Sequence, residues 1–218
     1  MIRLMSDRTT NVEPRWPVLL ALASVVGVHF SLPEVLSLGP RWLLVGAFVV
    51  LATFVSVLHS RGAAKKAYVV GLILMISVTA AVVESLVLLL RSLLAHSVVP
   101  LHLLQSAASL WICNVLVFAA WYWKLDAGGP YVREKFRRHE DGAFLFPQMA
   151  IHEESPTKPK SWQPRFIDYL FLSFNTSTAL SPTDTQVLSR WAKGLMMLQS
   201  LISLTIIVLL AARAVNIL

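Results

Sequence analysis

The sequence predicts an all-α, polytopic transmembrane protein with four spans, a re-entrant helical segment and a final span. Of its 218 residues, 56% are hydrophobic and 14% are charged, against roughly 45–50% and 25% in soluble domains. The apolar residues lie in long runs, the pattern of membrane helices. One shorter apolar stretch ends abruptly in hydroxyl-bearing residues. This composition excludes an ordinary soluble domain and a disordered chain.

Five apolar runs define the expected spans. They are residues 18–32, 43–58, 68–95, 101–123 and 194–218. At ~1.5 Å per residue the first run reaches only about 22 Å, short of a hydrocarbon core of about 30 Å. We expect the chain to divide into four parts. These are a basic N-terminal segment (1–17), a four-helix transmembrane region (18–123), a polar connector (124–165) and a C-terminal unit (166–218).

Positive charge falls on one side of this topology. Lys and Arg number three before the first run, one in the first loop, three in the second, one in the third loop region and eight in the connector. The positive-inside rule therefore predicts a multi-pass cell-membrane protein with its N-terminus and connector in the cytoplasm. The net charge of +7 is explained by orientation and lipid attraction, so we expect a bilayer and not nucleic acid as the partner.

The stretch 166–181 is too short for a comfortable span. Its first half is apolar and aromatic, and polar residues take over after Phe174. Asn175, Thr176 and Ser177 would be costly facing lipid. The pattern predicts a short helix that enters the membrane, stops midway and returns through an irregular turn shielded by protein. Such a half-helix followed by hydroxyl-rich backbone is one way to build an ion site.

Residues 169–184, YLFLSFNTSTALSPTD, together with RWAK at 190–193 and the final run, resemble the pore unit of potassium channels. That family has an aromatic pore helix, a threonine pair, the filter V-G-Y-G-D and an inner helix. In the resemblance Thr178 and Ala179 take the place of the threonine pair. Leu180 takes the place of the valine and Asp184 that of the closing aspartate. Ser181, Pro182 and Thr183 replace G-Y-G.

This replacement predicts a degenerate filter without potassium selectivity. A row of inward carbonyls is helped by glycine, whereas Pro182 fixes its own φ and biases Ser181 toward extended geometry. One loop per chain cannot close a pore, so conduction requires a homo-oligomer, most simply a tetramer, with a monovalent cation as the permeant ion. The expected pore-loop residues are Thr176, Thr178, Ala179, Leu180, Ser181, Pro182, Thr183 and Asp184.

The predicted orientation differs from that of the resembled family. A potassium-channel pore loop enters from outside the cell, whereas four preceding spans and a cytoplasmic connector predict entry from inside, as in ionotropic glutamate receptors.

The chain is also similar to a group of uncharacterised bacterial integral membrane proteins. The matching motifs are KLDAGGP at 124–130, FPQM at 146–149, SPTDT at 181–185 and AVNI at 214–217. The group carries no established activity, so this resemblance implies the membrane class and no mechanism.

Polar residues inside the other runs have two interpretations. Glu84 and Arg91 lie seven apart, on roughly one helix face, and could form a proton or cation site with Asn114 or Gln105. We favour the alternative, in which Arg91 extends to the interface and Glu84 bonds a neighbouring helix.

Three further residues remain open. Gln199 and Ser203 either line an aqueous path or bind helices together, and packing is slightly favoured. Asp184 either draws cations to a pore mouth or caps the final helix.

The sequence contains no G-x-S-x-G, no H-E-x-x-H and no histidine pair at metal-ligand spacing. We therefore expect neither an enzyme nor a cofactor or metal. The alternative to a channel-like protein is a non-conducting structural or partner-binding membrane subunit whose connector recruits a cytoplasmic partner.

Overall fold

The computed structural model describes residues 16–33, 36, 40, 42–95, 100–136, 142–150, 162–178 and 184–215. The helices are α1 (Trp16–Ser31), α2 (Trp42–Ser60), α3 (Ala64–Ala95), α4 (Pro100–Leu125), the 3₁₀ turn η2 (Asp126–Gly128), α5 (Pro130–Phe136), α6 (Pro147–Ala150), α7 (Phe166–Thr178) and α8 (Arg190–Val215). The strands are β1 (Phe144–Leu145) and β2 (Gln186–Val187). The expected all-α class is confirmed, with one two-stranded addition.

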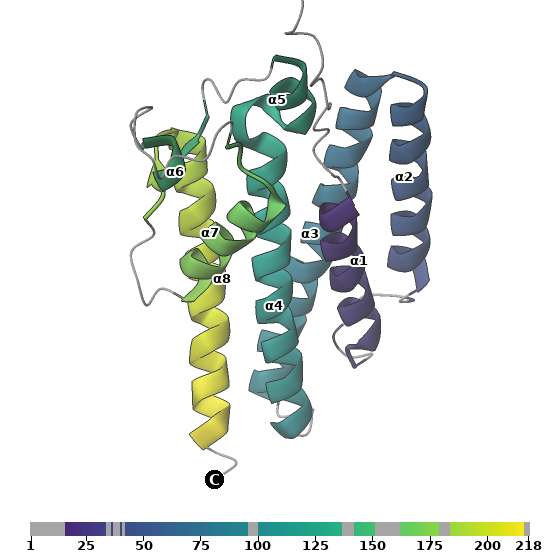
Figure 1. Ribbon diagram of the computed structural model, residues 1–218. Helices are drawn as coiled ribbons and strands as arrows, with labels where there is room; N and C mark the ends of the chain where they lie inside the picture. The colour runs from purple at the N-terminus through teal and green to yellow at the C-terminus, as the bar shows by residue number, and fades with distance from the viewer. Residues whose placement is uncertain are drawn as a thin grey trace, which may run out of the picture.

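Within the described part of the chain, four helices are long and apolar enough to cross a membrane: α2, α3, α4 and α8. They run alongside one another as a bundle (Figure 1). The first apolar run also forms a helix, but its apolar stretch, Trp16–His29, is shorter than these four.

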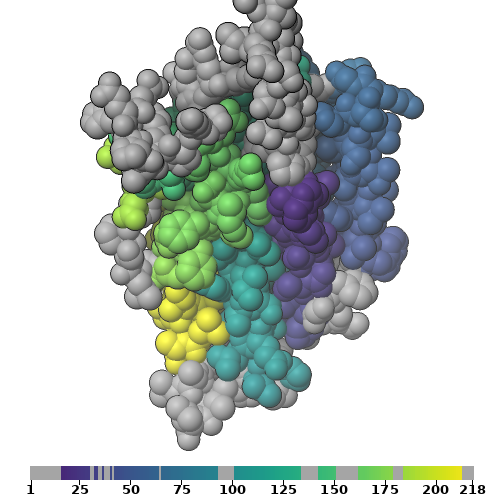
Figure 2. All heavy atoms as spheres, in the orientation of Figure 1, coloured from purple at the N-terminus to yellow at the C-terminus, as the bar shows by residue number. Residues whose placement is uncertain are grey.

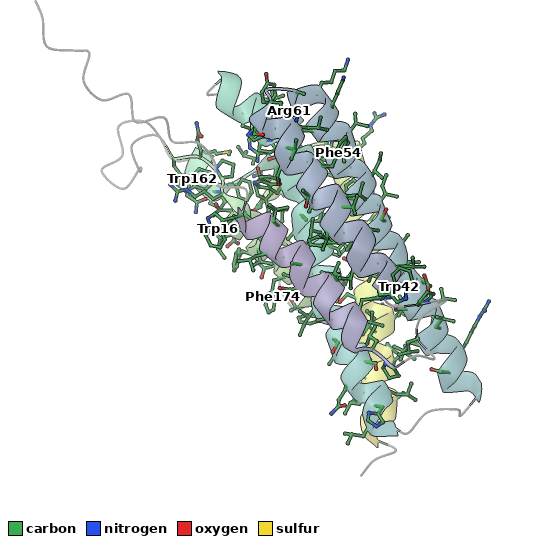
Figure 3. All side chains as sticks on the ribbon, turned by 90° about the vertical axis from the view of Figure 1, so that its right-hand side faces the viewer. Trp16, Trp42, Phe54, Arg61, Trp162 and Phe174 are labelled. Atoms are coloured by element: carbon green, nitrogen blue, oxygen red, sulfur yellow. The ribbon has the colours of Figure 1, made fainter. Side chains whose placement is uncertain are left out.

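Helix α4 is the centre of the bundle. It packs against α1 and α3 on one side and against α7 and α8 on the other, and Ala119, Ala120 and Tyr122 are completely buried. Helix α2 is the opposite case, because none of its residues is buried. Its large apolar side chains, such as Trp42 and Phe54, point outward (Figure 3), as they would on a lipid-facing helix.

A tight backbone turn ends α4. Gly128 and Gly129 both have positive φ, and Ala127 also adopts φ 48°. A Cβ on Gly129 would stand 2.6 Å from the Lys124 carbonyl oxygen, so glycine is required there. Pro130 then begins α5 at a first-turn position that needs no amide hydrogen.

The described residues 142–150 of the connector fold back on the bundle. Its strand β1 pairs antiparallel with β2, with Phe144 opposite Val187 and Leu145 opposite Gln186. Phe144 and Phe146 are buried and contact the Tyr169 ring of α7 edge-on. The connector is therefore tied both to α7 and to the residues just before α8.

Cationic segments gather at one end of the bundle. The α2–α3 turn, the first turn of α3, the end of α4, α5 and the start of α8 all lie at the same end (Figure 1), which Arg61 marks in Figure 3. The basic residues in these segments whose side chains are described are Arg61, Lys65, Lys66, Lys124, Arg133, Arg190 and Lys193. We call this the cationic end.

Candidate functional site: a half-length helix between α4 and α8

Helix α7 begins at the cationic end with a capped first turn. The Arg165 amide donates to Asp168 Oδ2 at 2.7 Å, the interaction that an acidic residue at the third helical position makes in a capping box. Burial raises the pKa of the Asp168 carboxyl, and the hydrogen bond and charge of Arg165 partly oppose this shift. Asp168 thus has the local geometry of a helix cap.

The buried carboxyl group of Asp126 holds the first turns of α7 in place. Asp126, completely buried, accepts hydrogen bonds from the Ala143 amide at 2.6 Å and from the Tyr169 hydroxyl at 2.7 Å. Arg133 donates to the Asp126 backbone oxygen at 2.8 Å and to the Trp123 oxygen at 3.0 Å. Its guanidinium lies 5.5 Å from the centre of the Tyr169 ring. Asp126 therefore joins α4, the connector and α7.

Gln199 of α8 is the centre of a buried polar cluster. Its Nε2, with two N–H groups, lies within hydrogen-bond distance of three acceptors: the Ser173 backbone oxygen at 2.8 Å and the hydroxyls of Ser173 and Ser177 at 2.7 and 2.6 Å. Its Oε1 accepts a hydrogen bond from the Tyr122 hydroxyl of α4. The Ser173 hydroxyl donates in turn to the Val115 oxygen at 2.7 Å. This cluster connects α4, α7 and α8 through side chains that are completely buried.

The C-terminal carbonyls of α7 are bonded by hydroxyl groups. The last four carbonyls of a helix have no partner within it. Here the Thr178 hydroxyl donates to the Asn175 oxygen at 3.0 Å and the Ser200 hydroxyl to the Thr176 oxygen at 3.3 Å. The Ser203 hydroxyl donates to the Ser177 oxygen. Three of the four are therefore satisfied within the chain.

These contacts fix how far α7 descends. Its tip lies level with Ser203, thirteen residues into α8, or about 20 Å along the axis at ~1.5 Å per residue. On α4, the same level lies near Trp111, whose indole donates to Ser203 at 2.8 Å. Helices α4 and α8 each have 26 residues, so α7 ends near their middle. Figure 1 shows α7 beside the half of each helix that is nearer the cationic end.

The chain returns to its starting end after α7. Strand β2 pairs with β1 of the connector, and the Leu188 amide donates to the Ala143 oxygen at 2.8 Å. Ala143 is also bonded to Asp126 at the end of α4, and so is Tyr169 in the first turns of α7. The start of α7 and the residues before α8 therefore both lie toward the cationic end. The end of α7 therefore lies at mid-length of α8, whereas the described residues from Asp184 to α8 lie back at the cationic end.

The expected pore-loop residues divide into three groups. Thr176 and Thr178 lie in the last turn of α7 and not in a loop, because the helix continues through Thr178. Asp184 is exposed, beside β2. The remaining ones, Ala179, Leu180, Ser181, Pro182 and Thr183, lie outside the described residues.

The expected intramembrane polar residues fall in two places. Gln199 and Ser203 both bond Ser177 in the last turn of α7, and Asn114 bonds the Gln199 backbone oxygen. Glu84 and Arg91 lie apart from them on α3, where both line an open groove that Trp121 of α4 also borders. The structure thus assembles the α8 residues with α7 and leaves the α3 pair outside that assembly.

Asn114 is only partly satisfied. Its Nδ2 donates to the Gln199 oxygen at 3.4 Å, while its Oδ1 is buried with no hydrogen-bond partner in the part of the chain that is described. Asn114 lines a cavity of about 10 Å³ between α3, α4 and α8, which is near the minimum that holds one water molecule.

Two residues of the candidate site could not be found from the sequence. Asp126 opens the stretch DAGGP at 126–130, which is typical of a turn, and its hydrogen bonds to distant residues have no local signal. Tyr122 belongs to an aromatic interfacial anchor by pattern, yet its hydroxyl is bonded to Gln199. Comparison with protein families, curated proteins and solved structures finds no match to this chain, so the site is interpreted from its own residues.

Proposed function

We propose that this chain is a subunit of a homo-oligomeric, channel-like membrane protein in which α4, α7 and α8 form the pore unit and monovalent cations are the permeant ions. One observation carries the proposal: α7 stops at mid-length of two membrane-long helices and the chain then returns to the end from which it came. Irregular backbone at membrane depth is tolerated where protein surrounds it or where it lines an aqueous cavity, the arrangement that ion pathways use.

The polarity of α7 favours a cation. A helix carries the equivalent of roughly half a negative charge at its C-terminus, and α7 directs this terminus toward the middle of the bundle. Exposed Asp184 adds negative charge on the returning segment. The first feature lowers the electrostatic energy of a cation near the end of α7, and the second does so near Asp184.

The outer surface of α7 supports assembly within a membrane. Ile167, Phe171 and Phe174 follow one helix face, and their exposed fractions are 64%, 61% and 46%. Part of α7 lies on the molecular surface in Figure 2. A mid-length helix with an apolar outer face suits contact with lipid or with a neighbouring subunit.

The cationic end supports cytoplasmic entry. Its Arg and Lys residues are those that the positive-inside rule assigns to the cytoplasm. We therefore propose that α7 enters the membrane from the cytoplasmic leaflet of a multi-pass cell-membrane protein.

Cation flux through reconstituted protein tests the proposal. Asp184→Asn should lower cation current several-fold at about 0.1 M salt and have little effect near 1 M salt, where the Debye length falls to about 3 Å. Asp184→Glu, which retains the charge, is the matched control and should conduct like wild type. No current from correctly inserted wild-type protein would refute conduction.

A second candidate is favoured by a different observation. Three terminal carbonyls of α7 and the amide of Gln199 are already bonded within one chain. A non-conducting structural or partner-binding subunit would use the unit in this way, as internal support. It predicts a monomer or dimer in mild detergent and no flux, whereas the channel-like assembly predicts a higher oligomer, most simply a tetramer.

A further inference from the structure

A pocket of about 280 Å³ opens at the cationic end, away from α7. It lies between α1, α2, α3 and the end of α4, and its volume is close to the lower limit of about 300 Å³ for ligand sites. Figure 3 faces the side on which α1 and α2 lie, with Trp16 at the start of α1 and Arg61 just after the end of α2.

The inner wall of this pocket is apolar and belongs to the core. Leu22 of α1 and Leu74 and Met75 of α3 line it and are buried. Val55 of α2, half-buried, forms the opposite wall. The wall is therefore already formed, and it suits hydrocarbon.

Lys124 of α4 places a cationic side chain in the lining of the pocket. The Lys124 ammonium lies 4.5 Å from the centre of the Tyr68 ring. It occupies space that a side chain at Gly71 would take, because a Cβ there would be 2.8 Å from Lys124 Nζ. Glycine at position 71 thus lets the ammonium sit against α3 at the top of an apolar pocket.

More positive charge lies close to the pocket along the chain. Exposed Arg61, in the α2–α3 turn, and exposed Lys65 and Lys66, in the first turn of α3, fall between the pocket residues His59 and Tyr68. Basic residues beside an apolar cleft, at the membrane surface predicted to face the cytoplasm, attract acidic lipid headgroups. The opening is complementary to an anion, and the wall behind it to an acyl chain.

We propose that this pocket binds one anionic phospholipid of the surrounding leaflet. Its phosphate lies at Lys124 and its acyl chain lies between α1, α2 and α3. The proposal is independent of conduction by the α7 unit.

Native mass spectrometry of the full chain in mild detergent tests this site. The probes are phosphatidylglycerol, phosphatidylcholine with the same acyl chains, and glycerol 3-phosphate, which has the charge but no chains. We expect a saturable 1:1 adduct with phosphatidylglycerol, at least about fivefold weaker binding of phosphatidylcholine, and no adduct with glycerol 3-phosphate.

Matched variants separate the two halves of the site. Lys124→Met should weaken phosphatidylglycerol binding about fivefold, Lys124→Arg should retain it, and Lys193→Met, which removes a cation of α8 at the same end, should leave it unchanged. Val55→Trp should reduce the binding of both lipids by filling the pocket, whereas Val50→Trp on the exposed part of α2 should not. Leu19→Trp, on α1, is the second filling variant if Val55→Trp lowers helicity.

Three results would overturn the proposal. These are equal binding of the two phospholipids, equal losses in Lys124→Met and Lys193→Met, and an adduct with glycerol 3-phosphate alone. The last would identify an anion site without a lipid chain.

Discussion

Replacing Gln199 by leucine should be among the most destabilising changes of similar volume in this protein. Leucine fills nearly the same space, but it removes the hydrogen bonds from α8 to Ser173 and Ser177 and the acceptor of the Tyr122 hydroxyl. Interhelical hydrogen bonds in membranes contribute about 0.6–1.7 kcal/mol each. Three such connections therefore give a loss of about 2–5 kcal/mol, a large part of a typical stability of about 5–15 kcal/mol.

Thermal unfolding in detergent, followed by helical circular dichroism, measures this loss. For a chain of this size about 1 kcal/mol corresponds to about 2–4 °C, so the midpoint should fall by roughly 4–20 °C. Thr205→Val is the matched control on the same helix, because the Thr205 hydroxyl bonds only within α8, to the Leu201 oxygen. It should change stability by no more than about 0.5 kcal/mol.

A double-mutant cycle sharpens the argument. Tyr122→Phe alone removes the hydroxyl and leaves Gln199 Oε1 without its Tyr122 donor, so it should destabilise by about 1–3 kcal/mol. In the Gln199→Leu background the same change should be neutral or stabilising, because the hydroxyl has already lost its acceptor there. Additive effects of the two changes, or a Thr205→Val loss as large as that of Gln199→Leu, would refute the assigned hydrogen bonds.

Three further changes test other parts of the fold. Asp126→Ala should destabilise the protein by about 2–5 kcal/mol, because it leaves the buried Ala143 amide and Tyr169 hydroxyl without their acceptor. Limited proteolysis should then cut the connector faster. Unchanged cleavage would argue against the role of Asp126 in holding the connector to α7. Asn114→Leu should leave the unfolding midpoint unchanged or raise it. It removes the unpaired buried Oδ1 and loses only one long hydrogen bond. A fall in the free energy of unfolding of more than about 1 kcal/mol would contradict this. Gly129→Ala should cost at least about 1–3 kcal/mol, because its backbone conformation of φ 86° and ψ 174° is one that essentially only glycine adopts. Gly46→Ala, in the exposed second turn of α2 where a Cβ meets nothing, should instead stabilise by up to about 1 kcal/mol. Equal effects of the two changes in denaturant titration would be inconsistent with the turn.

The helices were predictable because hydrophobicity alone specifies them. The runs expected at 101–123 and 194–218 appear as Pro100–Leu125 and Arg190–Val215. In a membrane the apolar stretch and the helix coincide, since every backbone group must be bonded within the segment. The boundaries shift by a few residues because prolines and aromatic anchors extend the helical turns.

The end of α7 was harder to predict. The hydroxyls after Phe174 indicate a loop by composition, yet Thr176 bonds the Leu172 oxygen and Thr178 the Asn175 oxygen. Threonine and serine can satisfy themselves against the preceding helical turn, so the helix continues. The partners Ser200 and Ser203 lie more than twenty residues away and have no local signal.

The connector was the least predictable part. Two-residue strands show no alternation, and the four residues of α6 show no helical period. Their positions depend on aromatic contacts, such as Phe146 with Tyr169, and on one carboxylate at Asp126. Such contacts are set by tertiary structure and not by nearby sequence.

The pairing of β1 with β2 has a mechanical consequence. Only two residues, Leu188 and Ser189, separate β2 from the first turn of α8, and Leu188 is itself bonded to Ala143. A force on the connector is therefore transmitted to the first turn of α8, because the link between β2 and α8 is too short to extend. A partner that binds the connector and displaces it must either break the β1–β2 hydrogen bonds or tilt α8.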